Sequence, residues 1–74
     1  MLKIKDNVDL KELEKFGLEE KNTFYTNEII AIAKDDRFIY HKLLDTIEKG
    51  YRLMMIIARL CQAGLVEKVG GKSE

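Results

Sequence analysis

The residue types that could carry out chemistry in this chain are few and scattered. His41 is the only histidine and Cys61 is the only cysteine. A cysteine nucleophile needs a histidine base within hydrogen-bond reach, and a structural zinc site needs four such ligands. No supporting motif surrounds either residue. We therefore predict no catalytic residue and no metal, with His41 at a solvent-facing strand end and Cys61 as a reduced thiol buried in the core.

Three other local patterns have simple structural interpretations. The adjacent carboxylates of Asp35 and Asp36 suit a turn better than a cation site or an acid pair. Gly70 and Gly71 lack the strand-to-helix context of a phosphate-binding loop. Met54 and Met55 suit either core packing or an adaptable recognition surface. No cofactor is expected, and we predict that the chain is not an enzyme.

The composition restricts the class of protein further. The chain has 74 residues, a net charge of zero, 46% apolar residues and 35% charged residues. We expect one domain over residues 1–69 and a flexible polar tail over residues 70–74. Zero net charge removes the general attraction to nucleic acid or to anionic lipid. The longest apolar run, residues 53–58, is far shorter than the ~18 residues of a membrane span, so we predict a cytoplasmic protein without a membrane partner.

The elements that must position these residues include one long helix over residues 45–64. Asp45 and Glu48 have the spacing of a capping box, which predicts that the helix begins near Thr46. Gly64 can adopt the left-handed conformation that ends a helix near Ala63, with Leu65 beside Leu60 in a Schellman motif.

This predicted helix is apolar around more than half of its circumference, which is wider than the stripe of an ordinary surface helix. One side is expected to cover a sheet. The other side needs either the rest of the chain or a second molecule to cover it. We predict that this second side is an interface, formed by Leu53, Ile56, Ile57 and Leu60.

A second, shorter helix is predicted over residues 10–16. Asp9 is its expected cap, Glu12 follows three residues later, and Gly17 with Leu18 ends it. Leu10, Leu13 and Phe16 would then face the core. The alternation in residues 2–4 indicates a short strand before this helix.

The middle of the chain favours strands. Residues 28–33 form a short apolar run, residues 34–37 resemble a turn, and residues 37–41 are aromatic and β-branched, which together predict a hairpin. Residues 23–26 would add a third strand. The alternative is a helix capped at Asn27 that runs to Asp35.

These elements predict an α+β fold: a short N-terminal helix, a small antiparallel β-meander and a long C-terminal helix packed on the sheet. Residues 65–69 would return as an edge strand.

Three segments resemble small uncharacterised proteins encoded by phages and prophages of Gram-positive bacteria. They are residues 4–17 (IKDNVDLKELEKFG), residues 36–40 (DRFIY) and residues 62–69 (QAGLVEKV). The resemblance implies a bacterial cytoplasm and brings no activity, substrate or catalytic residue with it.

Two functions remain to be compared. The first is a non-enzymatic interaction (accessory) protein that forms a homo-oligomer, or binds a host or phage protein, through the long helix. The alternative is a winged-helix-like DNA-binding regulator, because the long helix runs through Gly64 into a segment that resembles a wing. Its DNA contacts would come from Lys49, Arg52 and Arg59, which leave little of the polar face that base reading needs. We therefore do not expect nucleic acid as the partner.

Overall fold

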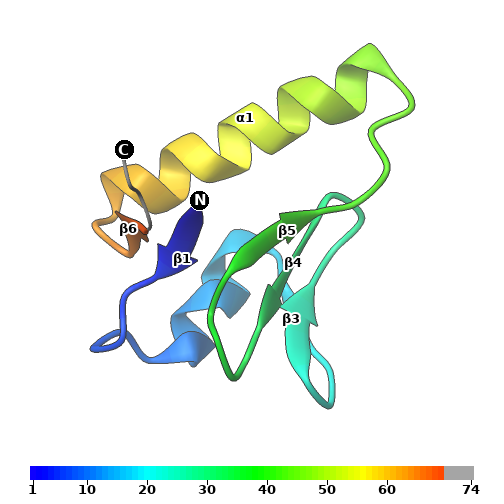
Figure 1. Ribbon diagram of the computed structural model, residues 1–74. Helices are drawn as coiled ribbons and strands as arrows, with labels where there is room; N and C mark the ends of the chain where they lie inside the picture. Colours follow the sequence, from blue (N-terminus) through cyan, green and yellow to red (C-terminus); the bar gives the residue numbers. More distant parts are fainter. Residues whose placement is uncertain (70–74) are drawn as a thin grey trace.

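The computed structural model describes residues 1–69, and they form the predicted α+β fold (Figure 1). In chain order the elements are β1 (Leu2–Ile4), the 3₁₀ helix η1 (Leu10–Phe16), β2 (Glu19–Glu20), β3 (Phe24–Thr26), β4 (Ile30–Ala33), β5 (Ile39–His41), α1 (Ile47–Gln62) and β6 (Val66–Lys68). The polar tail predicted over residues 70–74 lies outside the described residues.

Strands β2 to β5 form one antiparallel meander in chain order. Strand β4 alternates between the two faces of the sheet, because Ile30 and Ile32 are fully buried while Ala31 and Ala33 are half-buried. This period of two is typical of a strand with one face on a core. The predicted hairpin of β4 and β5 is confirmed, and so is β3 as its neighbour. The two-residue strand β2 was not predicted.

The helical alternative for residues 27–35 is wrong, because Ile30–Ala33 form strand β4. The Asn27 side-chain oxygen accepts hydrogen bonds from the backbone N–H groups of Ile29 (2.7 Å) and Ile30 (3.0 Å). Such bonds also occur at a helix cap, so Asn27 is compatible with both structures. The β-branched isoleucines that follow favour the strand.

A second, two-stranded sheet brings the two ends of the described chain together. Strand β1 pairs antiparallel with β6, and Ile4 lies opposite Val66. The Ile4 N–H group also donates to the Arg37 carbonyl oxygen at 2.9 Å, and a single β-bridge joins Lys3 to Phe38. The predicted edge strand near the C-terminal end is therefore confirmed as β6, and it is linked through β1 to the main sheet.

Helix η1 has the predicted bounds but 3₁₀ geometry. The Asp9 carboxylate accepts from the Lys11 N–H group at 3.0 Å, and Gly17 ends the helix in the left-handed conformation with φ 85°. Leu13 is fully buried, and Leu10 and Phe16 pack against the same core. With seven residues, η1 is longer than most 3₁₀ segments.

Helix α1 begins one residue later than its predicted start. The cap is Thr46, whose hydroxyl oxygen accepts from the Lys49 N–H group at 3.1 Å. The Asp45 carboxylate instead pairs with the Lys49 ammonium group at 3.0 Å, so the predicted capping role of Asp45 is wrong. A hydroxyl oxygen placed directly before the first turn satisfies the same free amide groups.

The C-terminal end of α1 confirms the predicted Schellman motif. The Leu65 N–H group donates to the Leu60 carbonyl oxygen at 3.2 Å, and the Gly64 N–H group donates to the Cys61 carbonyl oxygen at 3.0 Å. Gly64 has φ 77°, a region that glycine occupies without a steric penalty. Leu65 packs against the core that contains Leu60.

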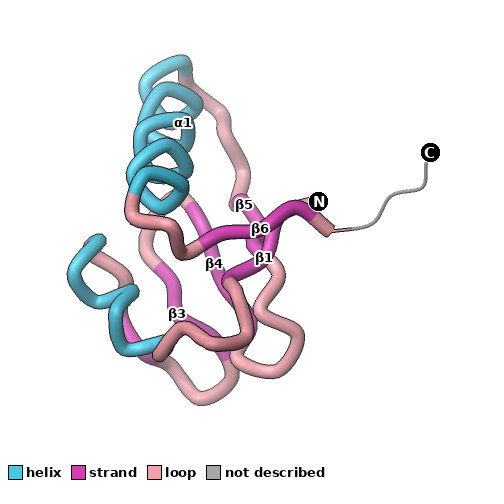
Figure 2. The backbone as a smooth tube through the Cα atoms, turned by 90° about the vertical axis from the view of Figure 1, so that its left-hand side faces the viewer, coloured by secondary structure: helices cyan, strands magenta, loops and turns pink. Residues whose placement is uncertain are grey.

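The core lies between the strands and the helices. Its buried apolar residues come mainly from the strands and loops; they are Ile4, Leu13, Leu18, Tyr25, Ile29, Ile30, Ile32 and Leu60. Figure 2 shows α1 and η1 on the same side of the strands. Helix α1 contributes only Leu60 to the fully buried set, so most of its surface is left outside the core.

Candidate functional site

The candidate site is the side of α1 that points away from the core. Four large apolar side chains on α1 are exposed: Ile47 (94%), Tyr51 (64%), Met54 (68%) and Met55 (43%). Ala58 and Cys61, in the following turns, are exposed as well. With about 100° per residue, Tyr51 lies roughly opposite Leu60, which is the one fully buried residue of the helix. We call Ile47, Tyr51, Met54, Ala58 and Cys61 the outer face.

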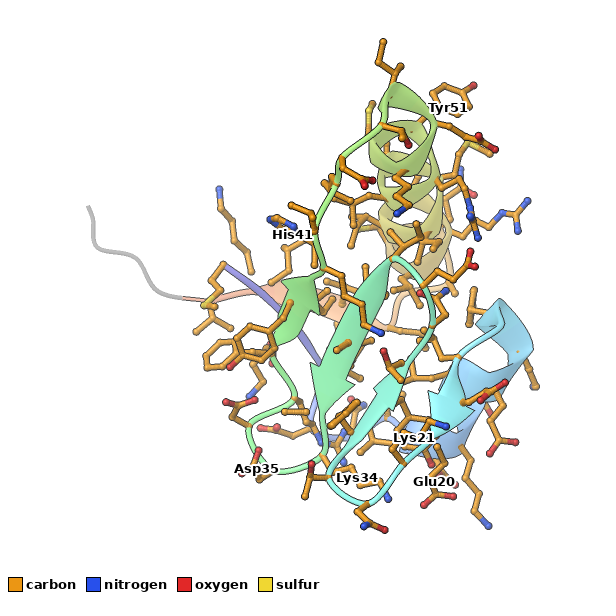
Figure 3. The ribbon with its side chains drawn as sticks, turned by 90° about the vertical axis from the view of Figure 1, so that its right-hand side faces the viewer. Glu20, Lys21, Lys34, Asp35, His41 and Tyr51 are labelled. Carbon is orange, nitrogen blue, oxygen red and sulfur yellow. The ribbon has the colours of Figure 1, made fainter. Side chains whose placement is uncertain are left out.

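The side-chain view labels one residue of the outer face, Tyr51 (Figure 3). The Tyr51 ring projects from the end of α1 that is remote from the strands (Figure 3). None of the other elements within residues 1–69 covers this part of the helix (Figure 1).

The residues predicted as the interface lie mostly on the inward side of α1. Leu60 is fully buried in the core, so its predicted role as a contact residue is wrong. Leu53 and Ile56 are half-buried and pack against the core. Ile57 is also half-buried and lies at the edge of the helix.

The misplacement has a physical reason. The sequence gives the width of the apolar arc but not which part of it faces the sheet. In the folded chain Leu53, Ile56 and Leu60 pack inward. Ile47, Tyr51 and Met54 are left outside.

Cys61 also differs from its predicted environment. We predicted a thiol buried in the apolar arc, whereas Cys61 is exposed and forms no disulfide. It follows Leu60 by one residue, and one step of about 100° carries the side chain away from the core. The prediction is therefore wrong, and Cys61 belongs to the outer face.

A shallow groove runs along each side of α1. The larger one, of about 550 Å³, lies between α1 and η1 and includes Phe16, Tyr51 and Met55. Its polar part is the ion pair in which Arg52 donates to the Glu28 carboxylate at 2.9 Å. The smaller one, of about 210 Å³, lies between α1 and the β1 and β5 strands and includes Leu2, Leu53 and Ile57. The larger groove borders the outer face at Tyr51, whereas the smaller one contains no outer-face residue.

The predicted DNA-contacting cations are largely engaged with carboxylates. Lys49 pairs with Asp45, and this ammonium group holds the pKa of the Asp45 carboxyl below its usual value. Arg52 pairs with Glu28. Arg59 lies beside the larger groove. Because two of the three cations already have an acidic partner, they do not form the concentrated positive surface that phosphate binding favours.

The remaining chemical candidates have structural roles. His41 is exposed at the end of β5, as predicted. Asp36 accepts hydrogen bonds from the Phe38 N–H group at 2.9 Å and from the Tyr40 hydroxyl at 3.0 Å, which confirms the predicted turn. Among residues 1–69 no group of three or more histidine, cysteine, aspartate or glutamate side chains is arranged to hold a metal ion.

The same described segment contains no helix with the length and hydropathy needed to cross a membrane. Comparisons of the chain with protein-family models, with curated proteins and with solved structures found no match. The resemblance to phage-encoded proteins therefore stays a prediction, and so does the alternative of a DNA-binding regulator.

Proposed function

We propose that this chain is a small non-enzymatic interaction protein that self-associates through the outer face of α1. The observation that supports the proposal is the exposure of large apolar side chains on the side of a helix opposite its buried residue. Met54 and Tyr51, at the middle of this face, are each more than half exposed. Single apolar residues on a surface are common, whereas a contiguous apolar patch is typical of an interaction site.

The free energy expected from burying these side chains supports an apolar contact. Full burial of a side chain such as Met54 contributes about 1.5–3 kcal/mol relative to leaving it in water. Several such side chains on one helix can offset the cost of association, which is of the order of 4–15 kcal/mol. Charged residues lie along one flank of the outer face, namely Glu48, Arg52 and Arg59, as in the polar rim of an ordinary interface.

A second copy of the chain is our first candidate for the partner. A domain of this size buries only about 60% of the surface of its unfolded chain, so self-association adds stability that a small core does not supply. The resemblance to phage-encoded proteins extends the proposal to a bacterial cytoplasm, where a phage or host protein would be the further partner of this accessory protein.

The test compares two substitutions of exposed apolar residues by glutamate. Met54→Glu puts a charge at the centre of the outer face, and Leu43→Glu puts the same charge at a matched position outside α1, where the side chain is 78% exposed. We expect Met54→Glu to weaken dimer formation at least ~10-fold, or about 1.4 kcal/mol. Leu43→Glu is expected to leave it unchanged. Sedimentation velocity gives the dissociation constants, and circular dichroism checks that both variants are folded.

The proposal fails if Met54→Glu is folded and associates as strongly as Leu43→Glu. It fails equally if the unmodified chain is monomeric at high concentration. An unfolded Met54→Glu protein would contradict the exposure of this side chain, and with it the assignment of the outer face.

A further inference from the structure

We infer that the outer face binds a second copy of the chain with the two α1 helices antiparallel. This inference rests on the proposed function and adds the orientation of the partner to it. It is carried by the spacing, the sizes and the charges of the residues on one face of α1.

The spacing of the outer face matches a helix-to-helix seam. Its five residues, at positions 47, 51, 54, 58 and 61, are separated by four, three, four and three residues in turn. This alternation repeats every seven residues and is the a/d pattern of two helices packed side by side. The core of the same chain lies on the opposite side of α1, so it does not require this pattern. Packing of a straight helical partner along the whole length of α1 does require this seven-residue repeat.

The sizes of the side chains change from one end of the seam to the other. The N-terminal half of the outer face carries the large residues Ile47, Tyr51 and Met54, and the C-terminal half carries the small residues Ala58 and Cys61. A parallel pair would place large residues against large ones at one end and leave space between small ones at the other. An antiparallel pair places the large half of each helix against the small half of its partner, which allows close packing along the whole seam.

The charged residues beside the seam also favour the antiparallel pair. Glu48 lies in the first turn of α1 and Arg59 lies in the last turn, on the same flank of the outer face. In an antiparallel pair, equivalent flanks face each other, so Glu48 of each helix approaches Arg59 of the other. In a parallel pair opposite flanks face each other, so Glu48 and Arg59 would lie against the uncharged flank that carries Gly50 and Ile57. The macrodipoles of the two helices also oppose one another favourably only in the antiparallel pair.

The single cysteine provides a direct test of orientation. In a parallel pair the Cys61 thiols of the two copies lie at the same height, and a mild oxidant would join them. In the antiparallel pair they lie at opposite ends of the seam, at least ~15 Å apart along the axis from a rise of ~1.5 Å per residue. A disulfide requires Cα atoms within about 7 Å.

The experiment oxidises four proteins with copper–phenanthroline, the unmodified chain and three cysteine variants, and maps the linked peptides by mass spectrometry. The unmodified chain is expected to give no covalent dimer. Ile47→Cys and Tyr51→Cys, each keeping Cys61, place a second thiol in the opposite half of the seam. At least one of them is expected to give a covalent dimer in which the new cysteine is joined to Cys61 of the other copy. Leu43→Cys, which lies outside the seam, is the control and should stay unlinked.

The outcomes separate the orientation from the proposed function. A Cys61–Cys61 disulfide in the unmodified chain overturns the antiparallel arrangement while leaving self-association intact. A dimer by light scattering that gives no linkage in either variant also overturns it. A monomer at all concentrations overturns the proposed function, and the inference with it.

Discussion

At the scale of single residues, the turn between β4 and β5 is held by its own side chains. The Asp36 carboxylate accepts from the Phe38 N–H group and from the Tyr40 hydroxyl, and Asp35 accepts from the Asp36 N–H group at 2.6 Å. Arg37 has a positive φ of 64°, which is uncommon for a residue other than glycine. Its guanidinium group donates to the carbonyl oxygens of Lys5 (2.6 Å) and Val8 (2.7 Å), which fixes the turn against the loop before η1.

The hydrogen bond from Tyr40 has a pH-dependent consequence. The Asp36 carboxylate holds the phenolic proton and opposes a second negative charge, so the pKa of Tyr40 is raised above its ordinary value of 10.0. We expect Asp36→Asn to lower the pKa of Tyr40 toward that value, as measured by NMR titration of the ring carbon resonances. The pKa of Tyr40 is higher in the folded chain than in the unfolded chain. The stability that the Tyr40–Asp36 hydrogen bond gives to the fold is therefore fully present below the unfolded pKa and is lost as pH rises through the folded pKa. An unchanged pKa in the variant would contradict the bond.

Residue exposure was the part of the site that the sequence predicted least well. The apolar arc of α1 was evident from the residue types, but Leu60 and Cys61 were assigned to the wrong surroundings. Periodicity orders side chains around a helix without giving the direction of the core. That direction depends on how α1 meets strands such as β4, and these contacts join residues far apart in the sequence.

At the scale of elements, helix ends were predictable because their signals are local. The sequence around Asp9 and Gly17 predicted the bounds of η1, and Gly64 with Leu65 predicted the end of α1. The start of α1 was missed by one residue because Asp45 and Thr46 are both good capping residues and lie next to each other. The strands followed from β-branched and aromatic runs, except for β2, whose two glutamates carry no strand signal.

Two glycines provide a matched stability test, one inside α1 (Gly50) and one at its C-terminal end (Gly64). Gly64 has a positive φ, so Gly64→Ala is expected to lower the free energy of unfolding by about 1 kcal/mol. Gly50 lies inside α1, and a methyl group added there meets no atom within 4 Å, so Gly50→Ala is expected to raise it by about 0.5–1 kcal/mol. Urea denaturation measures the free energy of unfolding of each variant. Both variants are made in the Met54→Glu background, which removes the contribution from association. Changes of the same sign in the two variants would contradict this assignment of the helix and its cap.

At the scale of the whole molecule, the chain places one long helix on a small core and leaves one side of that helix apolar. The described domain uses a single fully buried residue of α1, so the outer face has no function within the fold. The sequence predicted that α1 has more apolar surface than one sheet can cover. It did not predict which residues are left over, because that depends on the packing of the complete chain.

The measurement that tests the central proposal most directly is the molar mass of the unmodified chain by light scattering over a dilution series down to low micromolar concentration. If the outer face binds a second copy, the mass at the upper end will be twice the 8.6 kDa of one chain and will fall toward that value on dilution. A constant mass of one chain across the whole series would contradict self-association through α1.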